Sequence, residues 1–301
     1  MIFKLDNTII TYQQNRLYIF AHALQHAQER LHYVVMEQPV RTWIESNILS
    51  NTTYLSEWDI ESIKKDQFFM QPSALESRTL QTVIVGNGIN MLTIEQMLDV
   101  VDEPGVVVLE NGLNDWSVLR RWTNLMSQRR CPNKTINESV LNAMNTALLR
   151  NENAGGGFGT IKNRIISIEP NYKGLHALRV TTVFDSDKMS ALDMVDHNAS
   201  LKQFLTAEKM EWHELSRREM ENYFPIEAYQ RAGLMAQGLV LPASIVGNWA
   251  YEDIESVKGI NYVKNDLPLL TSNLSNQDID ALGANVLDEI QSVILHLAKY
   301  I

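Results

Sequence analysis

Short apolar runs alternate with longer amphipathic segments along this chain. Gly105 to Leu109 is continuously apolar and Val180 to Val183 is entirely β-branched, a composition typical of buried strands. Thr82 to Val85 is a third run of this kind. Trp116 to Gln128 and Ile161 to Ile168 instead place apolar residues at helical spacing. A chain that alternates in this way is expected to fold as an α/β protein built on a parallel sheet.

The remaining segments are predicted to be mainly helical. Asn15 to Val35 has the pattern of one helix, and Gln38 to Ala74 that of several short helices separated by polar breaks. Ile2 to Tyr12 alternates around an Asp-Asn pair and predicts a hairpin. Asn276 to Tyr300 predicts one long amphipathic helix, which either packs into the core or docks on a partner.

Acidic residues follow two of the predicted strands. Glu110 comes directly after Leu109, and Asp185 and Asp187 follow the Val180 strand in an Asp-x-Asp arrangement. In open α/β sheets, chemistry collects beyond the carboxyl ends of the strands. Two carboxylates there can bind one hard cation such as Mg²⁺, although Asp-rich turns after strands are also common without any ligand.

The order of these motifs resembles a known family. Glu110, the glycine-rich turn 155–159 and the pair Asp185-x-Asp187 together resemble the TOPRIM fold of topoisomerases, primases and overcoming-lysogenization-defect (OLD) nucleases. The later segment 217–223, Arg-Arg-Glu-Met-Glu-Asn-Tyr, resembles the Arg-Arg-x-x-Glu-Asn-Tyr element of OLD-type nucleases. The resemblance covers about residues 105–230.

The sequence departs from the family pattern near the first acidic residue. The family places glycine immediately after this Glu, whereas Asn111 intervenes here, and Asp115 stands one residue later than the pattern expects. The resemblance implies a TOPRIM-like Rossmannoid parallel sheet flanked by helices. We therefore expect an N-terminal α/β accessory region rich in helix (1–100), a TOPRIM-like catalytic domain (101–230) and a helical C-terminal region (231–301).

The resemblance also implies a metal-dependent endonuclease that uses Mg²⁺ or Mn²⁺. Asp185 and Asp187 would be metal ligands, Glu110 a ligand or the general acid/base, Glu221 a ligand of a second metal and Asp115 a further ligand. Such ions stabilise charge on the attacking and leaving oxygens of a phosphodiester and activate water. Phosphate contacts would come from nearby cations that otherwise form solvated helix faces: Lys162, Arg164, Lys188, Arg217 and Arg218.

The expected substrate is DNA or a structured RNA such as tRNA. OLD-type enzymes often act with an ABC-type ATPase in defence against phage, and this chain has no ATPase motif of its own. The resemblance therefore implies a toxic effector controlled by a separate ATPase. The sequence leaves open whether the chain forms a homo-oligomer. The alternatives are a non-catalytic interaction module and a topoisomerase or primase subunit, although primase-type zinc cysteines and a recognisable nucleophilic Tyr are not evident.

Composition and charge limit which classes of protein and which kinds of site remain plausible. The 301 residues are 45% hydrophobic and carry a formal net charge of −10, which argues against a broad non-specific nucleic-acid surface. A single cysteine, Cys131, excludes an intrachain disulfide. His22 and His26 stand four residues apart, but their apolar neighbours favour an ordinary amphipathic helix. No apolar stretch approaches the roughly 20 residues of a membrane span, so we expect a cytoplasmic protein without membrane contact.

Overall fold

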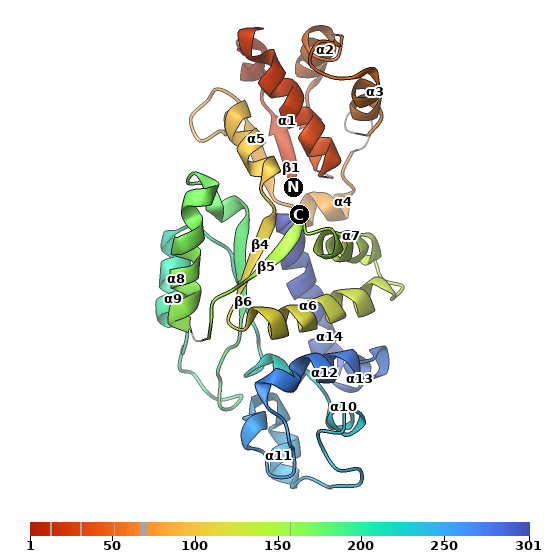
Figure 1. Ribbon diagram of the computed structural model, residues 1–301, viewed down its shortest axis with the longest axis vertical. Helices are drawn as coiled ribbons and strands as arrows, with labels where there is room; N and C mark the ends of the chain where they lie inside the picture. Colours follow the sequence, from red (N-terminus) through yellow and green to blue (C-terminus); the bar gives the residue numbers. More distant parts are fainter. Residues whose placement is uncertain (13, 31, 51, 67–70, 157) are drawn as a thin grey trace.

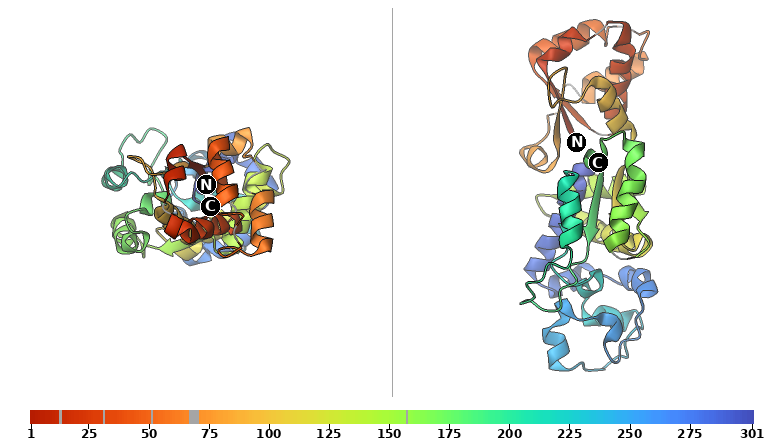
Figure 2. Two further views of the ribbon diagram at one scale, coloured as in Figure 1. Left: turned by 90° about the horizontal axis from the view of Figure 1, so that it is seen from above. Right: turned by 90° about the vertical axis from the view of Figure 1, so that its left-hand side faces the viewer.

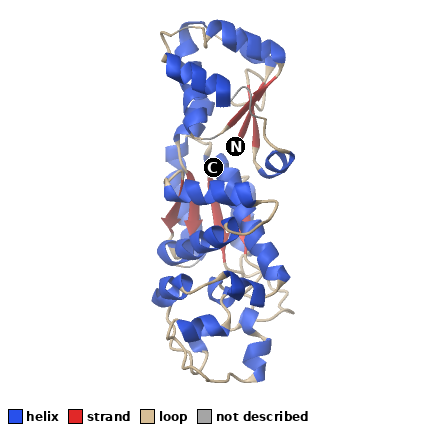
Figure 3. Ribbon diagram, turned by 90° about the vertical axis from the view of Figure 1, so that its right-hand side faces the viewer, coloured by secondary structure: helices blue, strands red, loops and turns tan. Residues whose placement is uncertain are grey.

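The chain folds as an α/β protein with two parallel sheets, each flanked by helices (Figures 1 and 3). This computed structural model describes residues 1–12, 14–30, 32–50, 52–66, 71–156 and 158–301. The molecule is elongated: the N-terminal helices lie at one end, the larger sheet in the middle and residues of the C-terminal third at the other end (Figure 2). The predicted α/β class with parallel strands is confirmed.

The first sheet has three strands in the order β2-β1-β3, all parallel: β1 (Ile2–Leu5), β2 (Tyr33–Met36) and β3 (Thr82–Val85). Five helices accompany it: α1 (Leu17–Glu29), α2 (Gln38–Asn47), α3 (Glu57–Asp66), α4 (Ala74–Thr79) and α5 (Ile94–Asp102). The strand β3 agrees with the sequence pattern. The side chain of Thr93 caps α5 by accepting a hydrogen bond from the N–H of Gln96.

One prediction for this region is wrong, and another is right only in part. The hairpin expected over residues 2–12 is absent from this described segment, because the carboxylate of Asp6 accepts a hydrogen bond from the N–H of Thr8 (2.9 Å) and starts a 3₁₀ helix, Asn7–Thr11. The helix expected over residues 15–35 ends at Glu29, and the chain then enters β2. Parallel pairing with β1 therefore overrides the local turn and helix signals.

The second sheet has four parallel strands in the order β5-β4-β6-β7: β4 (Gly105–Leu109), β5 (Leu149–Asn153), β6 (Val180–Phe184) and β7 (Trp212–Glu214). The helices between them are α6 (Gly112–Ser127), α7 (Lys134–Asn145), α8 (Phe158–Ile168) and α9 (Ala199–Ala207). Every residue of the central strands β4 and β6 is buried.

Helices cover both faces of this sheet (Figure 1). Because side chains alternate along a strand, Val106 and Val108 of β4 join a core with α8 and α9. Val107 and Leu109 instead join the core beneath α6, α7 and α14 (Ala284–Leu297). The two cores keep the carboxyl ends of β4 and β6 at one edge of a covered sheet.

The C-terminal region shares the second of these cores. Its other helices are α10 (Ile226–Arg231), α11 (Ala243–Gly247), α12 (Leu267–Ser272) and α13 (Asn276–Ala281). The single long helix predicted over residues 276–300 is wrong, because Gly283 adopts a left-handed φ of 94° and separates α13 from α14. Among the described residues, no helix is both long and apolar enough to cross a membrane.

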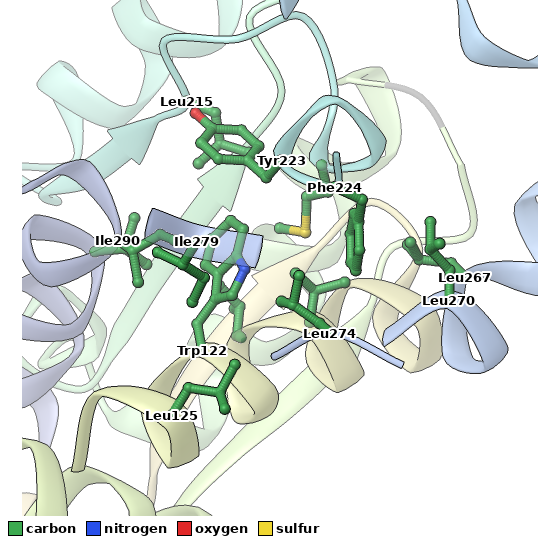
Figure 4. Close-up of a cluster of buried hydrophobic side chains, with 14 of the residues drawn as sticks. Trp122, Leu125, Leu215, Tyr223, Phe224, Leu267, Leu270, Leu274, Ile279 and Ile290 are labelled. Atoms are coloured by element: carbon green, nitrogen blue, oxygen red, sulfur yellow. The ribbon is translucent and has the colours of Figure 1, made fainter. Parts of the chain in front are cut away.

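Trp122 lies at the centre of the shared core (Figure 4). Its indole is fully buried and meets the ring of Tyr223 edge-on, with the ring centroids 5.1 Å apart. Leu125 follows it on α6, while Leu274 and Ile279 come from the C-terminal region (Figure 4). One side chain thus connects the helix that follows β4 with the segments that follow β7.

We expect Trp122→Ala to lower the free energy of unfolding by about 3–5 kcal/mol, because it leaves a cavity in this core. Trp122→Phe should cost much less, since the buried indole Nε1 makes no hydrogen bond that the substitution would remove. Urea unfolding followed by circular dichroism measures both. Equal losses for the two variants would show that the ring does not fill the core in this way.

Candidate active site

Two predicted acidic residues leave adjacent parallel strands at the same edge of the second sheet. Val108 of β4 pairs with Thr182 of β6. Glu110 stands two residues beyond Val108, and Asp185 stands three residues beyond Thr182. Both side chains therefore start at nearly the same level, beyond the carboxyl ends of the central strands.

A cavity of about 440 Å³ lies at this edge. Four carboxylates and one ammonium group line it together with amide and glycine backbone: Glu110, Asn111, Asp115, Asn153, Gly155, Gly156, Asp185, Glu221 and Lys264. The structure thus brings together four of the five acidic residues that the sequence singled out. They come from three separate parts of the chain.

The start of α6 is folded back against the end of β4. The N–H of Asn111 donates to Oδ2 of Asp115 at 2.9 Å, which brings Asp115 into the cavity. The N–H of Gly112 donates to Oδ1 of Asn153 at 3.1 Å. A Cβ on Gly112 would stand 2.7 Å from the Cβ of Asn153, so only glycine allows this close approach to the end of β5.

The glycine-rich turn packs on the backbone of Glu110. The N–H of Gly156 donates to the carbonyl of Glu110 at 3.0 Å, and the N–H of Gly155 donates to Oδ1 of Asn153 at 3.0 Å. Both glycines have positive φ, 88° and 93°, which L side chains rarely adopt. The turn therefore forms one wall of the cavity.

Backbone and tyrosine contacts position the other two carboxylates. Oδ1 of Asp185 accepts a hydrogen bond from the N–H of Met220 at 3.1 Å. Glu221 is buried in the short 3₁₀ helix Met220–Tyr223, where its Oε1 accepts from the hydroxyl of Tyr262 at 2.8 Å. The carbonyl of Glu221 accepts from the hydroxyl of Tyr229 at 2.9 Å. These bonds hold Asp185 and Glu221 among the residues that line the cavity.

Burial and mutual repulsion raise the pKa of Asp115, Asp185 and Glu219. Burial, then the charges of Glu221 and Glu110, raise the pKa of Asp115 to about 7, against a lowering hydrogen bond from Asn111. Burial and the charges of Glu221 and Asp115 raise the pKa of Asp185 well above its usual range. Burial and the charge of Glu221 likewise raise the pKa of Glu219 to about 7. The edge therefore holds more negative charge than its surroundings compensate.

Lys264 is the cation in this cavity that sequence reasoning missed. Burial alone would lower its pKa, but the carboxylates, led by Glu219 and Glu221, raise it above the usual value. Its carbonyl accepts from Nδ2 of Asn114 on α6 at 2.7 Å, which ties its loop to the sheet. The surrounding Val-Lys-Asn-Asp segment carries no motif, so only the tertiary fold reveals this residue.

Asp187, predicted as a metal ligand, is not among the residues that line the cavity. It follows Ser186, whose hydroxyl donates to the carbonyl of Arg217 at 2.8 Å. The N–H of Asp187 donates to the carbonyl of Arg218 at 3.1 Å, and its φ of 54° is left-handed. The second aspartate of the Asp-x-Asp pair is held here against the 217–218 backbone.

None of the five predicted phosphate-binding cations lines the cavity either. Lys162 lies over the ring of Phe204, with Nζ 5.2 Å from the centroid, and Arg164 pairs with Glu152. Nη1 of Arg217 donates to the carbonyl of Asn222 at 2.5 Å. The remaining two are Arg218, whose guanidinium lies 3.7 Å from the carboxylate of Glu219, and the half-buried Lys188.

We expect Asp115→Asn to stabilise the protein in the absence of divalent ions. The folded-state pKa of Asp115 is raised, so the unfolded chain releases this proton first and stability falls as pH rises from about 4 to 7. The advantage of the variant should grow across this window by up to about 1.4 kcal/mol per pH unit. Thermal unfolding in EDTA at pH 4.5 and 7.5 measures it.

Asp193→Asn is the matched control, because hydrogen bonds from His197 and from the N–H groups of Met189 and Val195 lower the pKa of Asp193 to about 2. Replacing Asp193 should therefore change the stability relative to wild type by about the same amount at pH 4.5 and at pH 7.5, with no gain at the higher pH. An Asp115→Asn variant that follows the same pattern would contradict the charge crowding described above.

The arrangement gathers four carboxylates and one ammonium group at one edge of a parallel sheet. Its carboxylate oxygens are the ligand type that Mg²⁺ prefers, and its lysine offers a positive charge beside them. Comparison with known proteins adds no assignment, since no family model, curated protein or solved structure matches the chain.

Proposed function

We propose that this protein is a metal-dependent nuclease of the TOPRIM type that hydrolyses phosphodiester bonds. The observation that supports it best is the meeting of Glu110, Asp115, Asp185 and Glu221 in one cavity with Lys264. Glu110 and Asp185 follow the carboxyl ends of adjacent parallel strands, where active sites of open α/β sheets collect.

The residues of the cavity suit Mg²⁺ or Mn²⁺. Their side-chain oxygens are hard ligands. The raised pKa values of Asp115 and Asp185 reflect burial first and then repulsion between the carboxylates, which a divalent cation would relieve. Asp185 and Glu221 would hold the ion, with Glu110 and Asp115 as further ligands. When bound, the metal would stabilise charge on the attacking and leaving oxygens and activate water.

The chain's own groups would do the rest. Lys264 keeps its proton at neutral pH, because the surrounding carboxylates raise its pKa, so its ammonium group can bind a non-bridging phosphate oxygen. Glu110 either binds metal or exchanges a proton with water or the leaving group. The hydroxyl of Tyr262 holds the carboxylate of Glu221 in place through the 2.8 Å hydrogen bond.

The biological setting is a proposal that rests on the resemblance to OLD-type enzymes. We propose a toxic effector of anti-phage defence that a separate ABC-type ATPase restrains or delivers. The net charge of −10 fits this view, because a chain whose net charge is negative needs a partner or bound metal to attract nucleic acid.

The direct test incubates the purified protein with plasmid DNA and with total tRNA in Mg²⁺, Mn²⁺ or EDTA. We expect cleavage only with metal, and loss of activity in Asp185→Asn. Lys264→Met should reduce the rate by roughly 100-fold or more, since it removes a charge next to the phosphate. Glu227→Gln, an exposed substitution on α10, should have no effect.

Asp187→Asn tests whether activity depends on the whole Asp-x-Asp motif or only on the residues that line the cavity. If only cavity residues matter, this variant retains most of its activity, whereas a loss equal to that of Asp185→Asn would place Asp187 in the metal site. A wild-type protein that stays inert even after co-expression with neighbouring ATPase genes would overturn the nuclease proposal and favour the interaction module.

A further inference from the structure

A second cluster of potential ligands lies on the other side of the four-stranded sheet from the cavity, at the amino ends of its strands. It consists of Glu169, His176 and Glu208. Glu169 directly follows α8, and His176 begins the 3₁₀ helix His176–Leu178 that leads into β6. Glu208 directly follows α9, shortly before β7. The cluster is therefore at the amino ends of strands whose carboxyl ends face the carboxylate cavity.

His176 is the unusual member of this cluster. Its residue surface is 6% exposed, and neither ring nitrogen makes a hydrogen bond. Nε2 stands 3.4 Å from Oε2 of Glu208, and Nδ1 stands 3.9 Å from Oε1 of Glu169. Because buried polar groups almost always have partners, an imidazole between two carboxylates with both nitrogens unsatisfied points to a missing ligand.

We infer that Glu169, His176 and Glu208 form a binding site for a first-row divalent transition ion such as Zn²⁺ or Mn²⁺. One ring nitrogen and one oxygen from each glutamate lie within 4.8 Å of one another. Ligands bound at about 2.1 Å from a common ion stand roughly 3–3.5 Å apart, so modest side-chain shifts close the site. Imidazole with carboxylates suits these ions, with water in the remaining positions.

The nearby lysine, Lys173, does not neutralise the two glutamates of this cluster. Lys173 lies between Glu169 and His176 in the sequence, but its Nζ binds Oδ1 of Asp99 at 2.7 Å. Its positive charge is therefore already paired with a carboxylate from the N-terminal region.

An ion here would join α8 to α9 at their carboxyl ends. The two helices lie side by side on one face of the sheet (Figures 1 and 2). Their amino ends border the cavity: α8 follows the glycine-rich turn, and Asn198, just before α9, donates to the carbonyl of Asp185 at 2.9 Å. The site is thus structural, and it does not depend on the proposed nuclease activity.

Pulsed electron paramagnetic resonance of Mn²⁺ bound to the full chain tests the assignment. Histidine is absent from the residues that line the carboxylate cavity, so ¹⁴N coupling from imidazole identifies Mn²⁺ at the second site. We expect this coupling in wild type and in Asp185→Asn, and its loss in His176→Gln. His197→Gln, at an exposed histidine paired with Asp193, is the control and should retain it.

Thermal unfolding supplies a second readout. At about 100 times its Kd, Zn²⁺ should raise the Tm of Asp185→Asn by roughly 4 °C. Adding Glu208→Gln, a change at a partly exposed position, should abolish the rise. This variant keeps the test valid if His176→Gln does not fold. Imidazole coupling that is absent, or that survives both substitutions, would overturn the site and leave His176 as a buried histidine beside two glutamates.

Discussion

The parallel pairing of β4 with β6 is the constraint on which the rest of the site depends. Both strands are buried along their whole length, so their apolar side chains determine which strands lie at the centre of the sheet. Once they are adjacent, Glu110 and Asp185 have to emerge together at one edge. The position of the carboxylate cavity therefore follows from the packing of apolar side chains in the strands and not from the charged residues themselves.

Such crowding of carboxylates costs stability. Asp115, Asp185 and Glu219 all have raised pKa values because burial and their neighbours disfavour the charged forms. A core that includes Trp122 and the C-terminal helices offsets this cost by holding the edge in place. Strain concentrated at one edge of an otherwise well-packed sheet is common in functional sites.

The C-terminal third completes the site. It supplies Lys264 to the cavity and Tyr262 to the carboxylate of Glu221, and its helices share the core beneath α6. The predicted boundary at residue 230 therefore runs through a continuous core. The proposed transition-metal site at the other edge would act on the same two helices, α8 and α9, that border the cavity.

The amino-acid sequence alone determined the central strands, because burial on both faces leaves a continuous apolar run. It also determined two of the helices between them, α6 and α8, and the acidic residues at the strand ends. It did not reveal β5 and β7, the edge strands, whose composition is polar or whose length is three residues. Only the tertiary structure brought Lys264 to the cavity and held Asp187 outside it. Their positions depend on long-range packing, which no local pattern of residues encodes.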